Sequence, residues 1–210
     1  MTSELASQGA PLERLKSRVK RALGPWGVFL EGFLKNPVMV GSIVPSSRFT
    51  IAKMLSVVDW DNTKLFVEYG PGVGTFCRPV LDRLPRDGML IVIDLNPDFI
   101  DYLKRTISDS RFVAVHGSAA DVEEIVRAHG HEKADYVLSG LPFSTLPPGV
   151  GPAIASATYR VIRKGGAFLV YQFTPRAGDF MAQFFARIDK GLEWINVPPC
   201  FLFWGWKDED

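Results

Sequence analysis

The sequence predicts an α/β protein, a three-layer α/β/α sandwich on a mixed seven-stranded sheet that ends in an antiparallel hairpin. Two observations carry this prediction. Short apolar runs alternate with segments of helical periodicity through the middle of the chain, which is the pattern of parallel βαβ units with right-handed crossovers. The chain then closes with two strand-like runs joined by Asn-Val-Pro-Pro, which predicts a hairpin added to a parallel sheet.

Length and composition indicate one globular domain. The chain has 210 residues, of which 47% are hydrophobic and 22% charged, as in ordinary folded domains. A net charge of +1 argues against a dedicated nucleic-acid-binding protein. The two cysteines lie far apart and form neither a disulfide framework nor a metal-ligand cluster, so we expect no metal. No run approaches the ~20 apolar residues of a membrane span, and the N-terminus lacks a signal-peptide core. These features predict a cytoplasmic protein.

Residues 1–36 are expected to form a helical extension, and residues 37–210 the main domain. Apolar residues recur at helical spacing across 11–35, with a kink expected at Gly24-Pro25. The intervening residues of the first half are mostly basic, namely Arg14, Lys16, Arg18, Lys20 and Arg21. A basic amphipathic helix can lie on an anionic membrane, which here would be the inner face of the membrane. It can equally pack on the sheet, and both interpretations stay open.

The elements of the domain follow in order along the chain. Ser46 or Ser47 can cap a helix that carries Ile51, Leu55 and Val58. Apolar runs predict buried strands at 64–69, 89–94, 111–116, 134–139 and 167–173. Helices are predicted near 75–84, from Asn96 or Asp98 onward, at 121–128, 150–163 and 179–185. The terminal hairpin is predicted from the runs 186–195 and 200–206.

A glycine-rich turn follows the first predicted strand and opens the next helix. Gly70, Gly72 and Gly74 allow a tight turn and a close approach of a ligand to the backbone. Asp94 ends the next strand, where a carboxylate can accept hydrogen bonds from both ribose hydroxyls of a nucleoside. Glu68 stands just before the turn, where its charge would repel a pyrophosphate but attract an ammonium or a sulfonium. These residues favour S-adenosylmethionine (AdoMet) over a dinucleotide.

At these residues the chain resembles the class I AdoMet-dependent methyltransferases, which have a Rossmann-like fold, over roughly residues 40–207. The resemblance implies that AdoMet binds at the glycine turn and leaves as S-adenosylhomocysteine. It places Leu95 against the adenine, Ser118 and Ala119 at the adenine edge, and Ser139 beside the cofactor.

The end of the fourth strand, Ser-Gly-Leu-Pro-Phe at 139–143, resembles the Asn-Leu-Pro-Tyr motif of rRNA adenine dimethyltransferases. In this fold that position faces the transferred methyl group. The side chain that accepts a hydrogen bond from the adenine amino group aligns with Gly140, which has no side-chain acceptor. Phe143 keeps the aromatic ring of the motif without its hydroxyl. This departure argues against an adenine substrate.

The chain also resembles the bacterial phospholipid N-methyltransferases, which convert phosphatidylethanolamine stepwise toward phosphatidylcholine and have relatives that act on ornithine lipids. The matching segments are residues 40–48, 68–74, 139–143 and 171–174. The resemblance implies an aminolipid substrate at the membrane surface. It implies no nucleic acid, and no protein partner is evident.

Aromatic and hydroxyl side chains supply candidate substrate contacts. Aromatic faces hold methylated ammonium ions, and four rings lie at predicted carboxyl ends of strands: Tyr69, Phe143, Tyr171 and Phe173. We assign Tyr69, Phe143 and Tyr171 to the catalytic centre and Phe173 to substrate binding, although core packing explains each ring as well. A phosphodiester would need donors such as Ser46, Ser47 and Arg48, of which the two serines can equally be helix caps. An rRNA adenine N6-methyltransferase and a soluble small-molecule methyltransferase remain alternatives.

Overall fold

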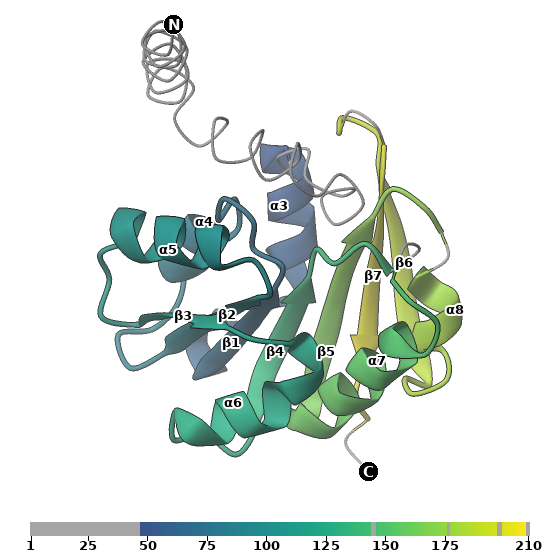
Figure 1. Ribbon diagram of the computed structural model, residues 1–210. Helices are drawn as coiled ribbons and strands as arrows, with labels where there is room; N and C mark the ends of the chain where they lie inside the picture. Colours follow the sequence, from purple (N-terminus) through teal and green to yellow (C-terminus); the bar gives the residue numbers. More distant parts are fainter. Residues whose placement is uncertain (1–46, 144–145, 176, 197–198, 209–210) are drawn as a thin grey trace, which may run out of the picture.

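A computed structural model describes residues 47–143, 146–175, 177–196 and 199–208. Within these ranges the chain forms a three-layer α/β/α sandwich, which confirms the predicted fold class (Figure 1). The expected N-terminal extension, residues 1–36, and the candidate Ser46 lie outside the described residues. In the described part of the chain, no helix combines the length and apolar character needed to cross a membrane.

The central sheet has seven strands in the order β3-β2-β1-β4-β5-β7-β6. Strands β1 to β5 are parallel, and β7 pairs antiparallel with both β5 and β6. The order reverses between β1 and β4, the place where open α/β sheets bind ligands at the carboxyl ends of their strands. The strands are β1 (Leu65–Tyr69), β2 (Met89–Asp94), β3 (Phe112–His116), β4 (Ala134–Ser139), β5 (Ile162–Gln172), β6 (Arg187–Glu193) and β7 (Cys200–Trp206).

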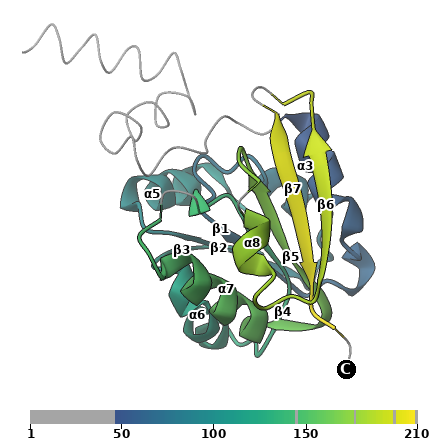
Figure 2. The same cartoon turned by 90° about the vertical axis from the view of Figure 1, so that its right-hand side faces the viewer.

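Helices cover both faces of the sheet, as Figures 1 and 2 show. They enclose two apolar cores. One face packs against α3 (Arg48–Met54), α4 (Cys77–Leu81) and α5 (Pro97–Thr106). The other packs against α6 (Val122–Ala128), α7 (Val150–Val161) and α8 (Ala177–Met181). Successive strand residues point to opposite faces, so each buried strand contributes to both cores.

Several boundaries differ from the sequence-based expectation. The fifth strand begins at Ile162 rather than 167, because Ile162 pairs with Ala134 of β4 and the backbone of Gly165 and Gly166 exchanges hydrogen bonds with Lys207 beyond β7. The helix after the glycine turn is shorter than predicted and begins at Cys77. The expected cap of α3 is confirmed, because the Ser47 side chain accepts a hydrogen bond from the Thr50 N–H.

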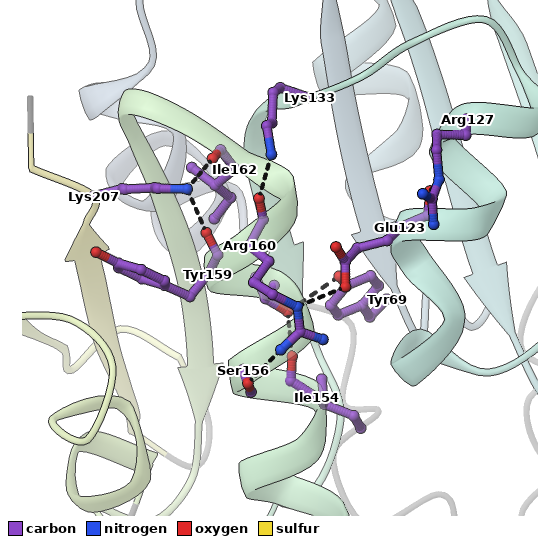
Figure 3. Close-up of polar contacts among 11 residues, drawn as sticks. Tyr69, Glu123, Arg127, Lys133, Ile154, Ser156, Tyr159, Arg160, Ile162 and Lys207 are labelled. Atoms are coloured by element: carbon purple, nitrogen blue, oxygen red, sulfur yellow. Dashed lines mark hydrogen bonds and ion pairs between the residues drawn. The ribbon is translucent and has the colours of Figure 1, made fainter.

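Polar contacts join neighbouring helices and strands at positions that hydrophobic periodicity does not predict. Arg160 on α7 donates to Glu123 on α6, and Lys207 Nζ donates to the carbonyl oxygens of Tyr159 and Ile162 (Figure 3). At the amino end of the sheet, the buried Asp135 carboxylate accepts the backbone N–H groups of residues 64 and 65, at 2.7 and 2.8 Å. It also pairs with the Arg163 guanidinium. Asp135 therefore joins the starts of β1, β4 and β5.

Candidate active site

The glycine turn lies between β1 and α4, at the carboxyl edge where the strand order reverses. Gly70, Gly72 and Gly74 all have positive φ, at 61°, 54° and 81°. A Cβ atom at Gly70 would lie 2.9 Å from Leu141 Cδ2, and one at Gly74 would lie 2.6 Å from Leu103 Cδ2. The positive φ values therefore favour glycine at all three positions, and at Gly70 and Gly74 a Cβ atom would also crowd a leucine side chain. The backbone at these glycines stays accessible to a ligand.

Two carboxylates flank this turn at the ends of neighbouring strands. Glu68 is 1% exposed, and its Oε2 accepts a hydrogen bond from Cys77 Sγ at 3.4 Å. Burial raises the pKa of Glu68 to about 8, and the nearby charge of Asp94 acts in the same direction. Burial also raises the pKa of Asp94, to about 6, although hydrogen bonds from the backbone N–H groups of Asn96 and Gly72 oppose it. The edge thus concentrates buried acidic groups that a cation would stabilise.

This donor set fits AdoMet. An ammonium and a sulfonium would compensate the buried carboxyl of Glu68. The carboxylate of Asp94 accepts the Asn96 N–H at 2.8 Å, and a carboxylate has about four acceptor sites, so capacity remains for ribose hydroxyls. Leu95, the next residue, is 57% exposed and offers an apolar surface to a purine ring.

The remaining predicted cofactor residues follow strands β3 and β4. His116 pairs with Asp94 in the sheet, and the Gly117 N–H donates to the Asp94 carbonyl oxygen at 3.0 Å. Ser118 and Ala119 come directly after this point, and Ser118 Oγ accepts the Ala120 N–H. Ser139 pairs with Tyr69 across β4 and β1 and is fully buried. The structure therefore brings these predicted residues to one edge, and their contacts with a cofactor remain predictions.

Gly140 packs against the Tyr171 side chain, a contact that the sequence does not predict. A Cβ atom at Gly140 would lie 2.3 Å from Tyr171 Oη and 3.3 Å from the Gly70 carbonyl oxygen. The Tyr171 ring packs on Phe76, with centroids 5.0 Å apart. The position where rRNA adenine dimethyltransferases carry an amide or carboxylate acceptor is thus filled by the Tyr171 hydroxyl.

Tyr69 and Phe143 lie on the opposite face from Tyr171. The Tyr69 hydroxyl is 3.1 Å from Thr158 Oγ1 on α7, and burial raises its pKa (Figure 3). The Phe143 ring packs against Phe180 of α8, with centroids 4.3 Å apart. Adjacent strand residues alternate between faces, so the side chains of Glu68 and Tyr69 point to opposite faces of the sheet. The structure does not join the predicted catalytic residues into one cluster.

The candidate substrate residues also lie in different environments. Phe173 packs on the core face that holds Tyr171. Ser47 caps α3, and its backbone N–H donates to Asn196 Oδ1 at 3.0 Å. Arg48 is exposed, with its guanidinium 4.9 Å from the centroid of the Phe49 ring. Ser47 therefore has the helix-cap role left open above, and Arg48 remains a candidate donor.

Three polar residues at this edge were missed by sequence reasoning. Asn196 is 3% exposed and joins the β6–β7 hairpin to α3. Gln172 donates from Nε2 to the Leu141 carbonyl oxygen and so holds the loop after β4. Thr174 Oγ1 is buried with no hydrogen-bond partner in the described ranges. The one local signal was the Tyr-Gln-Phe-Thr run at the end of a predicted strand.

In the part of the chain that the structure describes, no three His, Cys, Asp or Glu side chains are grouped to hold a metal ion.

Comparison with known proteins bears on the enzyme class of the chain. Residues 66–166 match a family model described as a methyltransferase domain. An ornithine lipid N-methyltransferase of Singulisphaera acidiphila is 29% identical over 175 residues, which are 82% of this chain and 91% of that protein. The chain is a class I AdoMet-dependent methyltransferase. The predicted enzyme class and cofactor are thereby confirmed.

The matched rRNA methyltransferases resemble this methyltransferase over less of their length. Ribosomal RNA small subunit methyltransferase H of Burkholderia ambifaria is 32% identical over 59% of this chain, which spans 37% of that relative. Among solved structures, the N-methyltransferase NodS of Bradyrhizobium japonicum has a TM-score of 0.60 at 12% identity, over 77% of this chain and 96% of its own. A precorrin-6y C5,15-methyltransferase of Geobacter metallireducens also has a TM-score of 0.60, at 14% identity over 81% and 94%. These structures share the fold of the methyltransferase.

Proposed function

We propose that the methyltransferase transfers methyl groups from AdoMet to the amine of an aminolipid headgroup at a membrane surface. The substrates would be phosphatidylethanolamine and its methylated intermediates toward phosphatidylcholine. The observation that carries the proposal is the match to an ornithine lipid N-methyltransferase across nearly the whole of that protein. Phosphatidylethanolamine and ornithine lipids both present a primary amine, so the same chemistry serves either headgroup.

The environment of Gly140 supports an amine other than the adenine amino group. An amide or carboxylate side chain at residue 140 would overlap the Tyr171 hydroxyl. A phenolic oxygen can accept a hydrogen bond while its own proton is donated elsewhere. Tyr171 would thus accept an N–H of the neutral headgroup amine, while its ring, with Phe76 and Phe173 nearby, offers an aromatic environment to the methylated cation.

The other residues of the edge have roles that follow from their placement. Bound AdoMet supplies a methyl group already activated on a sulfonium. The glycine turn admits the cofactor to the backbone, Glu68 compensates its positive charge, and Asp94 orients its ribose. Thr174 would donate its hydroxyl proton to an oxygen of the headgroup. Because the donor is activated, positioning of the amine supplies most of the required rate enhancement.

An experiment with parallel acceptors tests the proposal. The full chain is incubated with methyl-labelled AdoMet and one of four acceptors: vesicles of phosphatidylethanolamine with phosphatidylglycerol, vesicles containing ornithine lipid, ribosomal RNA, or soluble amines such as ethanolamine. Label in mono-, di- or trimethylated lipid supports the proposal and identifies the headgroup. Label in RNA alone would overturn it in favour of the rRNA relatives, and label only in soluble amines would indicate a small-molecule enzyme.

The predicted location belongs to the same proposal. Residues 11–35 would attach the enzyme to the anionic inner face of the membrane through their basic and apolar faces. Vesicle co-sedimentation of the full chain, compared with a chain lacking these residues, measures that contribution.

A further inference from the structure

The exposed large apolar side chains of the described residues gather at one end of the molecule. They are Phe49, Leu95, Val150, Trp194 and Ile195. Leu95 follows the last residue of β2, and Val150 begins the helix that follows β4. Phe201 of β7 pairs with both Gln172 and Leu192, so the end of β6 lies level with the carboxyl end of β5. This is the edge of the sheet that carries the glycine turn and Tyr171.

Within this group, the turn after β6 presents apolar side chains outward and polar ones inward. Trp194 is 72% exposed and Ile195 60%, whereas the flanking Glu193 and Asn196 are 8% and 3% exposed. Folding normally buries the apolar residues of such a tetrapeptide and exposes the charged one. The inversion places two large apolar side chains side by side in solvent.

Hydrogen bonds hold this arrangement in place. Asn196 Oδ1 accepts from the Ser47 N–H at 3.0 Å and from Thr50 Oγ1 at 3.1 Å. Glu193 Oε1 accepts the Ile195 N–H at 3.0 Å, and Lys53 Nζ donates to the Leu192 carbonyl oxygen at 2.8 Å. The hairpin tip is thereby held beside α3 (Figures 1 and 2). Arg48 and Phe49 at the start of this helix are also exposed.

We propose that Trp194 and Ile195, with Phe49 and Arg48 beside them, form a docking surface that inserts into the interface of an anionic bilayer. Tryptophan rings favour the membrane–water interface, where one part of the ring is apolar and its N–H stays hydrated. The Arg48 guanidinium adds attraction to anionic headgroups. Because the surface lies on the edge that holds Tyr171, insertion turns the methyl-transfer site toward the lipid headgroups. The inference rests on the proposed function and adds a contact outside residues 11–35.

A labelled cysteine reports insertion at this surface independently of the N-terminal segment. Cys77 and Cys200 are both buried, so an environment-sensitive fluorophore on Ile195→Cys in the full chain labels the hairpin tip. The matched control is Glu132→Cys, an exposed position just before β4, at the opposite end of the strands. With vesicles of phosphatidylethanolamine and phosphatidylglycerol, we expect a blue shift and quenching by brominated acyl chains at 195 but not at 132. The same response at both sites, or none at 195, would overturn the docking surface.

Variants at the tip measure its contribution to binding. Trp194→Ser with Ile195→Ser should weaken vesicle binding at least tenfold, since the burial of two large apolar side chains is removed. Trp194→Phe with Ile195→Leu should retain binding. A blue shift that occurs without vesicles and disappears on dilution would instead indicate contact between two copies of the chain and would overturn the proposal.

The two proposals fail separately. Methylation of dispersed short-chain phosphatidylethanolamine without insertion of residue 195 would contradict the docking surface and support the proposed enzyme activity. Insertion of residue 195 without methylation of any lipid would contradict the proposed lipid substrate and support the membrane contact.

Discussion

Replacing Gly140 with alanine tests whether the Tyr171 hydroxyl fills the acceptor position of the methyltransferase. The new Cβ atom would lie 2.3 Å from Tyr171 Oη and 2.8 Å from its Cζ, where ordinary contact needs 3.4–4 Å. Gly140 does not have positive φ, so the expected effect is steric rather than conformational. Tyr171 is 9% exposed and packed on Phe76, so its ring has little room to move.

Overpacking of this kind costs about 1–3 kcal/mol, which lowers the melting temperature by about 2–4 °C for each kcal/mol in a chain of this size. The free energy of unfolding is measured by urea denaturation, and activity by label transfer to phosphatidylethanolamine vesicles. Activity should fall along with stability, because the displaced phenol no longer meets the amine. In a Tyr171→Phe background the cost should be about 0.5–1 kcal/mol smaller, since the closest overlap is gone.

Gly117→Ala is the matched control for this prediction. A Cβ atom there would meet Ile125 Cδ1 at 3.5 Å and Val115 Cγ1 at 3.7 Å, which are ordinary contacts. The substitution should change stability far less than Gly140→Ala. Equal stability of the two variants, with no coupling to Tyr171→Phe, would refute the assigned packing.

Three further predictions follow from the same edge and from the base of the sheet. Burial raises the pKa of Glu68 from 4.5 to about 8, so the folded cofactor-free protein binds a proton that the unfolded chain releases. Its free energy of unfolding should therefore fall as the pH rises from 4.5 to about 8. In Glu68→Gln this free energy, measured by denaturation at several pH values, should depend less on pH. An unchanged pH dependence would contradict the raised pKa of Glu68. Tyr171→Phe should reduce kcat on lipid about tenfold, the value of one hydrogen bond, with AdoMet affinity by calorimetry unchanged. Tyr159→Phe, on the other face of the sheet, should leave both kcat and AdoMet affinity unchanged. Equal losses of kcat in the two variants would argue against a role of Tyr171 in catalysis. Asp135→Ala should lower the free energy of unfolding by about 2–3 kcal/mol, because the buried N–H of Leu65 and the partly buried N–H of Lys64 lose their acceptor. Stability equal to that of the wild type would show that water replaces the carboxylate.

Much of the cofactor edge was predictable because its signals are local. The apolar run before Glu68, the three glycines and the acid at Asp94 lie within a single βαβ unit. Such a unit folds the same way wherever its sequence pattern occurs. The same locality explains why the Ser47 cap was predicted.

The substrate side was predicted less well because it depends on which face of a strand each residue occupies. Tyr69 was grouped with Tyr171 since both end predicted strands, but Tyr69 points toward α7 and Tyr171 toward Phe76. The boundaries of α4 and β5 also differ from the predicted ones. The Gly165 and Gly166 pairing with Lys207 joins residues about 40 positions apart in sequence, which no local pattern encodes.

The sequence by itself determined the alternation of strands and helices, the glycine turn and the acids beside it, because each is a property of neighbouring residues. Tertiary structure alone decided that the Tyr171 hydroxyl meets Gly140, and that Asn196 fastens an exposed Trp194 and Ile195 to α3. These contacts join segments 31 to 149 residues apart. Their geometry is set by strand order and register, which emerge only when the whole sheet assembles.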